Sequence, residues 1–331
     1  MLHSARQAMM STYTSARFQR WRGALGVLLF LAIFVAGQCC LQTGVINQYY
    51  YRALVQVCIF IIAAASLNLI NGITGQFSLG HAGFMTVGGY TAAVLTHDYA
   101  CPFPLALLAG AILAGVLGIL GGLPTLRLRG DYLAIATLGL GEVVRVVFEN
   151  IQRYGGAGGF SGIRTPASLY GPHQFSLWGW GMSCAGITLL CIQQFIHSSH
   201  GRACIAIRED ELAAETLGIH VVRYKVLAFC VGAAFAGVAG GLLAHLVRTI
   251  TPDQAGFLKS VEVLVIVVLG GLGSLTGTGI ASIFVTLVNF FTANMAAWRM
   301  VIFALLLILV MLVQPGKRWR TWRAQRGHHD A

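Results

Sequence analysis

The sequence has little charge of either sign. Charged residues make up 10% of its 331 residues and hydrophobic residues 56%, whereas soluble domains carry about 25% charged residues. A chain this apolar cannot bury its side chains in one soluble core, which argues against a soluble protein. The net charge of +11 invites a nucleic-acid hypothesis. However, the basic residues gather at the two ends and in a few connections, which is typical of membrane topology, so we expect no nucleic-acid partner.

Lysine is scarce, and catalytic motifs are missing. A Walker A motif needs Gly-Lys-Ser/Thr, but the lysines are Lys225, Lys259 and Lys317, and only Lys317 follows a glycine, with Arg318 next. The chain therefore cannot hydrolyse ATP by that route. No G-x-S-x-G, no H-E-x-x-H and no pair of catalytic carboxylates stands out, so no catalytic residue is predicted.

Metal-binding patterns are also lacking. His197 and His200 are spaced H-x-x-H with no third ligand near, so we interpret them as interfacial polar residues. The cysteines form no C-x-x-C pair and most lie in apolar runs, so we interpret them as small buried hydrophobes and predict no metal site. They are Cys39, Cys40, Cys58, Cys101, Cys184, Cys191, Cys204 and Cys230.

What the chain does have is a series of apolar runs, each near the ~17–25 residues that cross a bilayer. They predict an all-α fold: a polytopic α-helical integral membrane protein with about ten transmembrane spans and glycine-broken elements. A transmembrane domain at 24–313 then lies between a basic N-terminus at 1–23 and a basic tail at 314–331. The runs cover residues 24–41, 53–70, 82–96, 105–123, 132–150, 175–196, 226–247, 261–291 (two runs, divided near Gly270–Gly273) and 297–313.

The distribution of positive charge predicts the orientation. With ten spans and an inside N-terminus, fifteen Lys and Arg residues fall on the inner side and six on the outer side. This asymmetry agrees with the positive-inside rule. Both termini and the connection at 198–225 are therefore expected in the cytoplasm.

That connection, 198–225, is the longest charged interval between apolar runs. Four of the eleven acidic residues lie in it, at Glu209, Asp210, Glu211 and Glu215. A short charged helix between two spans has two interpretations, a solvated loop or a docking helix for a soluble partner.

A polar window interrupts the apolar pattern between two spans. Polar groups at membrane depth are tolerated when they are buried in protein or line a wet cavity, so one interpretation is a broken element on a translocation path. The alternative is hydrogen bonding between packed helices. A second glycine-broken element at Gly270–Gly279 weakly suggests an internal repeat around a central path. The window's polar residues are Asn68, Asn71, Thr74, Gln76, Ser78 and His81.

One apolar run carries a charged trio. Glu142, Arg145 and Glu149 are spaced i, i+3 and i+7, so they share a helical face and Arg145 can reach both carboxylates. Either they form a structural ion cluster, or they form a substrate or proton site.

Three segments stand out as motifs: Leu67–Tyr90 (LNLINGITGQFSLGHAGFMTVGGY), Leu126–Arg145 (LRLRGDYLAIATLGLGEVVR) and Gly201–Leu243. All three resemble one known family, the LivM-type membrane subunit of ABC importers for branched-chain amino acids, and Gly270–Gly279 (GGLGSLTGTG) matches the family's late glycine element. Within this resemblance the stretch from Arg208 to Gly218 looks like the coupling loop that contacts the ATPase subunits. The coupling residues are then Arg208, Glu209, Glu211, Ala213, Ala214 and Gly218.

The resemblance implies a multi-pass permease subunit in a bacterial inner membrane. Its implied partners are the lipid bilayer, a second related permease, two ATP-binding subunits and a periplasmic substrate-binding protein. ATP and Mg²⁺ would bind the partner subunits, and no cofactor is expected on this chain. Urea or amide importers share the architecture and stay an alternative. An ion-coupled secondary transporter is a further one, with the trio at Glu142, Arg145 and Glu149 as its only candidate site.

Overall fold

A computed structural model describes residues 48–125, 128, 130–164 and 176–292, together with the single positions 38, 305 and 308. Contacts divide the chain into two units, residues 1–51 and 52–331, and the fold described below belongs to the second. Apart from those single positions, the expected spans at 24–41 and 297–313 lie outside the described residues, as do both basic ends.

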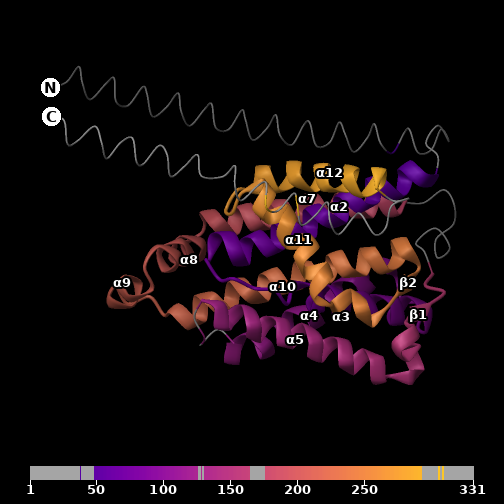
Figure 1. The fold of residues 1–331 in the computed structure, drawn as a ribbon, viewed down its shortest axis with the longest axis horizontal. Coiled ribbons are helices and arrows are strands. Elements are labelled where there is room, and N and C mark those ends of the chain that lie inside the picture. The colour runs from indigo at the N-terminus through magenta and orange to yellow at the C-terminus, as the bar shows by residue number, and fades with distance from the viewer. Residues whose placement is uncertain are drawn as a thin grey trace, which may run out of the picture. The chain divides into compact units, whose positions relative to one another are not determined.

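Helices make up nearly all of the described structure (Figure 1). This confirms the all-α class, and most helices end within a few residues of the apolar runs. In chain order the long ones are α2 (Gln48–Asn68), α3 (His81–His97), α4 (Phe103–Thr125), α5 (Asp131–Asn150), α7 (Leu177–His197), α10 (Val221–Val247), α11 (Phe257–Gly270) and α12 (Leu275–Phe291).

Several of these helices are long and apolar enough to cross a bilayer. Among the described residues there are four, and the 17-residue apolar helix Leu275–Phe291 is shorter. Such helices are typical of a multi-pass membrane protein. The four are Tyr49–Ile73, Phe103–Thr125, Leu177–His197 and Val221–Val247.

One boundary differs from the expected one, and one small element was not expected. The apolar run predicts a helix from Ala53, but α2 begins five residues earlier, at Gln48, because the tyrosines at 49–51 are part of the helix. The strictly all-α expectation also misses a small antiparallel ribbon, in which β1 (Phe160–Ser161) pairs with β2 (Thr249–Ile250). The ribbon ties the connection after α5 to the one after α10.

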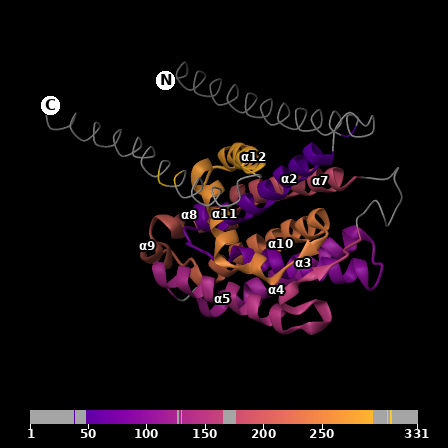
Figure 2. The same ribbon diagram turned by 45° about the vertical axis from the view of Figure 1, so that its right-hand side comes forward.

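Glycines bring the central helices α3, α4 and α10 close together (Figure 2). A Cβ on Gly240 of α10 would collide with the carbonyl oxygen of Met85 in α3, and a Cβ on Gly237 would lie 2.8 Å from the carbonyl oxygen of Gly110 in α4. Close backbone approach of this kind is the usual role of glycine in membrane helix pairs. It gives part of the 41 glycines a packing reason.

The expected division of the long run at 261–291 is confirmed. Helix α11 stops at Gly270, and α12 starts at Leu275 after a turn in which Gly271 and Gly273 have positive φ. Ser274 caps α12 by accepting a hydrogen bond from the Gly277 amide at 3.1 Å. Helices α11 and α12 pack against each other as a hairpin.

The charged connection folds into two short helices, α8 (Ser199–Glu209) and α9 (Glu211–Thr216). Ser198 caps α8 by accepting from the Gly201 amide at 3.2 Å. Within residues 52–331, α8 and α9 lie at the end opposite the β1–β2 ribbon (Figure 1). The charged segment and the loops after α5 and α10 are therefore at opposite ends of the spans.

Candidate functional site: the polar window and the charged segment

The polar window begins where α2 changes its hydrogen-bonding pattern. Residues Leu69–Ile73 form a π-helical turn, in which the Thr74 amide donates to the Leu69 carbonyl at 3.2 Å. Such π-turns occur frequently at functional sites. The chain then runs without regular structure until α3 begins at His81. The window is therefore a broken element, as expected.

Asn68 joins this break to the second glycine-broken element. Its Oδ1 accepts from the Gly273 amide at 2.8 Å. Its Nδ2 donates to the Ser274 carbonyl at 3.1 Å and to the Thr278 hydroxyl at 3.0 Å. Gly72 and Gly273 pack so closely that a Cβ on Gly72 would collide with the Gly273 amide nitrogen. The polar window and the glycine-broken element at Gly270–Gly279, for which the sequence suggested an internal repeat, are thus in direct contact.

For Asn68 this contact favours packing between helices, which is the alternative interpretation of the window. Thr74 also has a local role, because its hydroxyl donates to the Ile70 carbonyl at 2.6 Å. Both side chains are buried, with 0% and 3% of their surface exposed. Neither has a free polar group that points to a path.

The other four polar residues of the window differ. Asn71, Gln76, Ser78 and His81 are all buried, yet within the described residues each has a side-chain polar atom with no hydrogen-bond partner. Unpartnered polar atoms inside a protein are costly, so native ones call for an explanation. These atoms are Asn71 Nδ2, Gln76 Oε1 and Nε2, Ser78 Oγ and His81 Nδ1.

His81 is held in place by its other ring nitrogen. Its Nε2 lies 2.9 Å from the Ser66 hydroxyl and 3.1 Å from the Ala63 carbonyl, both on α2. Asn71 is fixed in a similar way, because its Oδ1 accepts from the Ser78 amide at 3.1 Å. In both side chains one polar atom is therefore held by a hydrogen bond. The other polar atom, His81 Nδ1 or Asn71 Nδ2, has no hydrogen-bond partner among the described residues.

The charged segment is built as a fixed unit. Asp210 separates α8 from α9 and caps α9, since its Oδ1 accepts from the amides of Leu212 at 2.9 Å and Ala213 at 3.1 Å. Gly218 follows α9 with a φ of 81°. Glycine commonly follows the end of a helix with such a positive φ.

Ala214 is buried within this chain. The resemblance places it where a partner approaches, but it is 2% exposed and packs with Ile207 and Val221 inside this chain. Its small side chain lets α9 lie against α8 and α10. The large residues that α9 and the turn after it expose are instead Leu212 and Leu217, at 63% and 79%.

The acidic residues of the segment have partners within the chain. Glu211 pairs with Lys225 of α10 at 2.9 Å, where the Lys225 side chain is only 10% exposed. Glu209 is 69% exposed and accepts from Arg208 Nη2 at 2.7 Å. Glu211 therefore anchors α9 to α10, while Glu209 stays at the surface.

Arg208 makes a contact that sequence reasoning missed. Its Nη1 donates to the Gly72 carbonyl at 2.7 Å, across 136 positions of sequence. Its Cγ would lie 2.7 Å from a Cβ placed on Gly75. The charged segment and the polar window, predicted separately, therefore touch.

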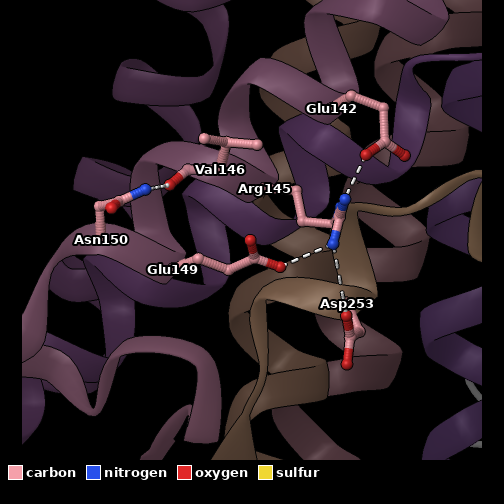
Figure 3. Close-up of polar contacts among 6 residues, drawn as sticks. All are labelled: Glu142, Arg145, Val146, Glu149, Asn150 and Asp253. Carbon is pink, nitrogen blue, oxygen red and sulfur yellow. Dashed lines mark hydrogen bonds and ion pairs between the residues drawn. The ribbon is translucent and has the colours of Figure 1, made fainter.

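The charged trio on α5 is assembled as predicted (Figure 3). Arg145 contacts Glu142 through Nε and Glu149 through Nη1, each at 2.6 Å. Asp253, in the 3-10 turn η4 (Pro252–Ala255), lies 3.9 Å from the same Nη1. Because Arg145 binds carboxylates from both α5 and η4, this geometry favours a structural ion cluster.

A further ion pair, on α11, was missed by sequence reasoning. Lys259 Nζ contacts Glu262 Oε2 at 2.7 Å, and Asn289 of α12 donates to Glu262 Oε1 at 3.0 Å. The i, i+3 spacing of Lys259 and Glu262 is a usable signal in the sequence. The contact from Asn289 has no such signal in the sequence, because it depends on how the turn brings α12 against α11.

The described residues contain no group of three or more His, Cys, Asp or Glu that could hold a metal ion. The six described cysteines are free, and Cys58 and Cys204 are buried as expected. Cys191 is exposed on the surface of α7, which is one of the candidate membrane spans.

Comparison with known proteins agrees with this architecture. A family model for the permease component of branched-chain amino acid transport systems matches residues 49–311. The high-affinity branched-chain amino acid permease protein LivM of Escherichia coli (strain K12) is 35% identical over 285 residues, which cover 78% of this chain and 67% of the relative. A probable LivM of Methanocaldococcus jannaschii is 26% identical over 184 residues, covering 53% of this chain and 52% of that protein.

A second kind of permease protein also matches. LivH of Escherichia coli (strain K12) is 36% identical over 132 residues, which cover 39% of this chain and 42% of LivH. No solved structure shows a significant match. From the family match and the similarity to LivM, the chain belongs to the family of permease components of branched-chain amino acid transport systems.

Proposed function

We propose that this chain is one of two related permease subunits of an ABC importer, and that it carries branched-chain amino acids through a bacterial inner membrane. A periplasmic binding protein delivers the amino acid, and two ATP-binding subunits hydrolyse ATP with Mg²⁺. The similarity to both LivM and LivH, two permease proteins named for one transport system in Escherichia coli, supports a second permease subunit.

The α8–α9 segment is the observation that carries this proposal. It is a charged, capped helical unit placed between two spans, and its own ion pair to α10 holds it against the transmembrane helices. A solvated loop needs no such construction. The chain also lacks a Walker A motif, so the segment fits a docking site for a separate ATP-binding subunit.

The docking surface is the outer side of α9. Leu212 and Leu217 supply exposed apolar contacts, with the smaller Ala213 beside them. A hollow of about 510 Å³ adjoins α9 and is lined by Glu215 and residues 218–223. Leucines beside charged residues resemble the apolar centre and polar rim of protein interfaces. Glu209 lies in that rim and Gly218 in the hollow, whereas Glu211 and Ala214 hold α9 in place.

The translocation path runs beside the polar window. Asn71, Gln76, Ser78 and His81 bring unpartnered amide, hydroxyl and imidazole atoms into an apolar interior. An amino acid has a charged ammonium and a charged carboxylate, which need polar partners when they leave water. Asn68 and Thr74 shape the window without contacting the substrate.

The transmembrane domain spans 24–313 and includes the cytoplasmic coupling connection at 198–225. Both termini face the cytoplasm, in accord with the positive-inside distribution of charge. The α8–α9 end of the described helices is then the cytoplasmic end, and the β1–β2 ribbon lies at the periplasmic end. The Glu142–Arg145–Glu149 cluster holds η4 to α5 near that outer end.

Reconstitution of the complex tests this function. The chain should co-purify with the second permease and the two ATP-binding subunits, and leucine-loaded binding protein should stimulate ATP hydrolysis. Urea in place of leucine should give no stimulation. A chain that inserts in the membrane but binds no ATP-binding subunit would contradict the proposal.

A further inference from the structure

Arg208 connects two parts of the chain that have separate roles in the proposed function. It occupies the last turn of α8, two residues before Asp210, which caps α9. Its Nη2 contacts Glu209 at the surface, and its Nη1 reaches the Gly72 carbonyl in the π-turn at 2.7 Å. One guanidinium therefore bridges the docking segment and the polar window.

The π-turn offers a free acceptor at this place. The helix ends at Ile73, so the carbonyls of its last turn lose the amide donors that a longer helix would supply. Arg208 provides a charged donor instead, and hydrogen bonds with a charged partner are stronger than neutral ones. The bond therefore holds the end of α2 to α8.

The neighbouring backbone is shaped to admit this side chain. Gly75 has a φ of 69° and lies against the Arg208 stem, where a Cβ would be 2.7 Å from Cγ. On the other side, a Cβ on Gly273 would lie 3.4 Å from Arg208 Nη1. Arg208 thus sits at the junction of the polar window and the α11–α12 turn.

Asn68 extends the connection to the second broken element. It lies one residue before the π-turn and binds Gly273, Ser274 and Thr278 through both ends of its amide. A displacement of α8 would therefore move the Gly72 carbonyl and, through Asn68, the start of α12. This chain of contacts is contiguous from the docking segment to the window.

We propose that Arg208 is the positioning residue that transmits movement of the α8–α9 segment to the polar window. The proposal rests on the proposed function, because it assumes that an ATP-binding subunit moves α9. It adds a specific route within this chain, through the Gly72 carbonyl. Docking itself depends on α9. Loss of the Arg208 side chain should therefore impair the transmission of movement while assembly with the ATP-binding subunits is kept.

The test uses the reconstituted complex with three variants. Arg208→Met keeps a long stem against Gly75 but removes every donor, whereas Arg208→Lys keeps one charged donor. Arg202→Gln is the matched control, since Arg202 is exposed on the same helix and its guanidinium donates only a long 3.4 Å bond, to the His197 carbonyl just before the segment. Assembly, basal ATP hydrolysis, leucine-stimulated ATP hydrolysis and leucine uptake are measured for each.

Arg208→Met should assemble, while leucine uptake and the ratio of stimulated to basal ATP hydrolysis fall about tenfold, in line with loss of one charged hydrogen bond. Arg208→Lys should recover part of that loss, and Arg202→Gln should behave as wild type. Full stimulation in Arg208→Met would overturn the proposal, and so would equal losses of assembly, basal and stimulated activity. A wild-type chain that fails to bind ATP-binding subunits would instead refute the proposed function.

Discussion

Single glycines set the distance between the central helices. Gly240 faces the backbone of Met85 so closely that a methyl group would collide with a carbonyl oxygen, which cannot rotate away. At Gly139, by contrast, a Cβ would meet no neighbouring atom within 4 Å. The same substitution should therefore have different consequences for stability at these two positions.

Gly240→Ala should lower stability, because α3 and α10 must separate to admit the methyl group. Overpacking of this kind costs about 1–3 kcal/mol. We expect a lower melting temperature in detergent and a smaller yield of monodisperse protein. Gly139→Ala is the control and should match wild type or exceed it slightly. Equal melting temperatures for the two variants would contradict the close packing of α3 and α10.

Gln76 offers the sharpest test of the path. Gln76→Leu preserves volume but removes both unpartnered polar atoms, so it should lower leucine uptake about tenfold if those atoms bind substrate. Assembly with the ATP-binding subunits should survive. Thr91→Val is a suitable control, because the Thr91 hydroxyl donates to the Val87 carbonyl of its own helix at 2.7 Å. Unchanged uptake together with failed assembly would assign Gln76 to packing.

Cys204 should be chemically inert in the folded protein. Burial raises the pKa of the Cys204 thiol to about 11, and the thiolate is the reactive species. Below that pH the thiol stays protonated, so its alkylation should be at least about a hundredfold slower at neutral pH than that of an exposed cysteine. Arg202→Cys on the same helix is the control, read by mass spectrometry of the labelled peptides. Equal labelling would show that α8 does not pack against α10.

At the scale of elements, the apolar runs predicted the helices well. Run length and flanking glycine or proline locate α3, α4, α5 and α12 to within a few residues, because each mainly apolar helix continues until glycine, proline or polar residues end it. Spacing on one helix also predicted the Arg145 contacts with Glu142 and Glu149. Such features depend on local sequence alone.

Contacts between distant elements could not be predicted in this way. The Asn68–Gly273 bond spans 205 positions and the Arg208–Gly72 bond spans 136. Hydrophobic periodicity says which face of a helix is buried, but not which neighbour covers it. For the same reason sequence reasoning assigns Ala214 to a partner, although it packs against Ile207 and Val221.

The α9 helix should depend on its cap. Asp210→Ala removes the acceptor for the Leu212 and Ala213 amides, which costs about 1 kcal/mol. We expect amide hydrogen exchange in Glu211–Thr216 to accelerate about fivefold, the factor that corresponds to that cost. Asp210→Asn keeps the acceptor and should exchange as wild type. Unchanged protection in Asp210→Ala would mean that the Glu211–Lys225 pair alone holds α9.

At the scale of the whole molecule, the fold places the charged segment and the β1–β2 ribbon at opposite ends of the spans. This arrangement predicts that a reagent outside the cell reaches the ribbon end but not the charged segment. A cysteine introduced at exposed Glu215 should resist a membrane-impermeant reagent added outside intact cells, and one at exposed Ser161 should react. Reaction at position 215 with protection at 161 would reverse the proposed orientation.

The energy source of uptake tests the central claim most directly. The chain lacks a Walker A motif, the charged trio on α5 is paired within the chain, and α9 is capped by Asp210 and ion-paired to α10. Leucine uptake into vesicles that contain the complete complex should therefore require internal ATP and loaded binding protein, and should persist when an uncoupler collapses the proton gradient. Uptake that stops with the uncoupler while ATP is maintained would contradict this account and identify an ion-coupled transporter.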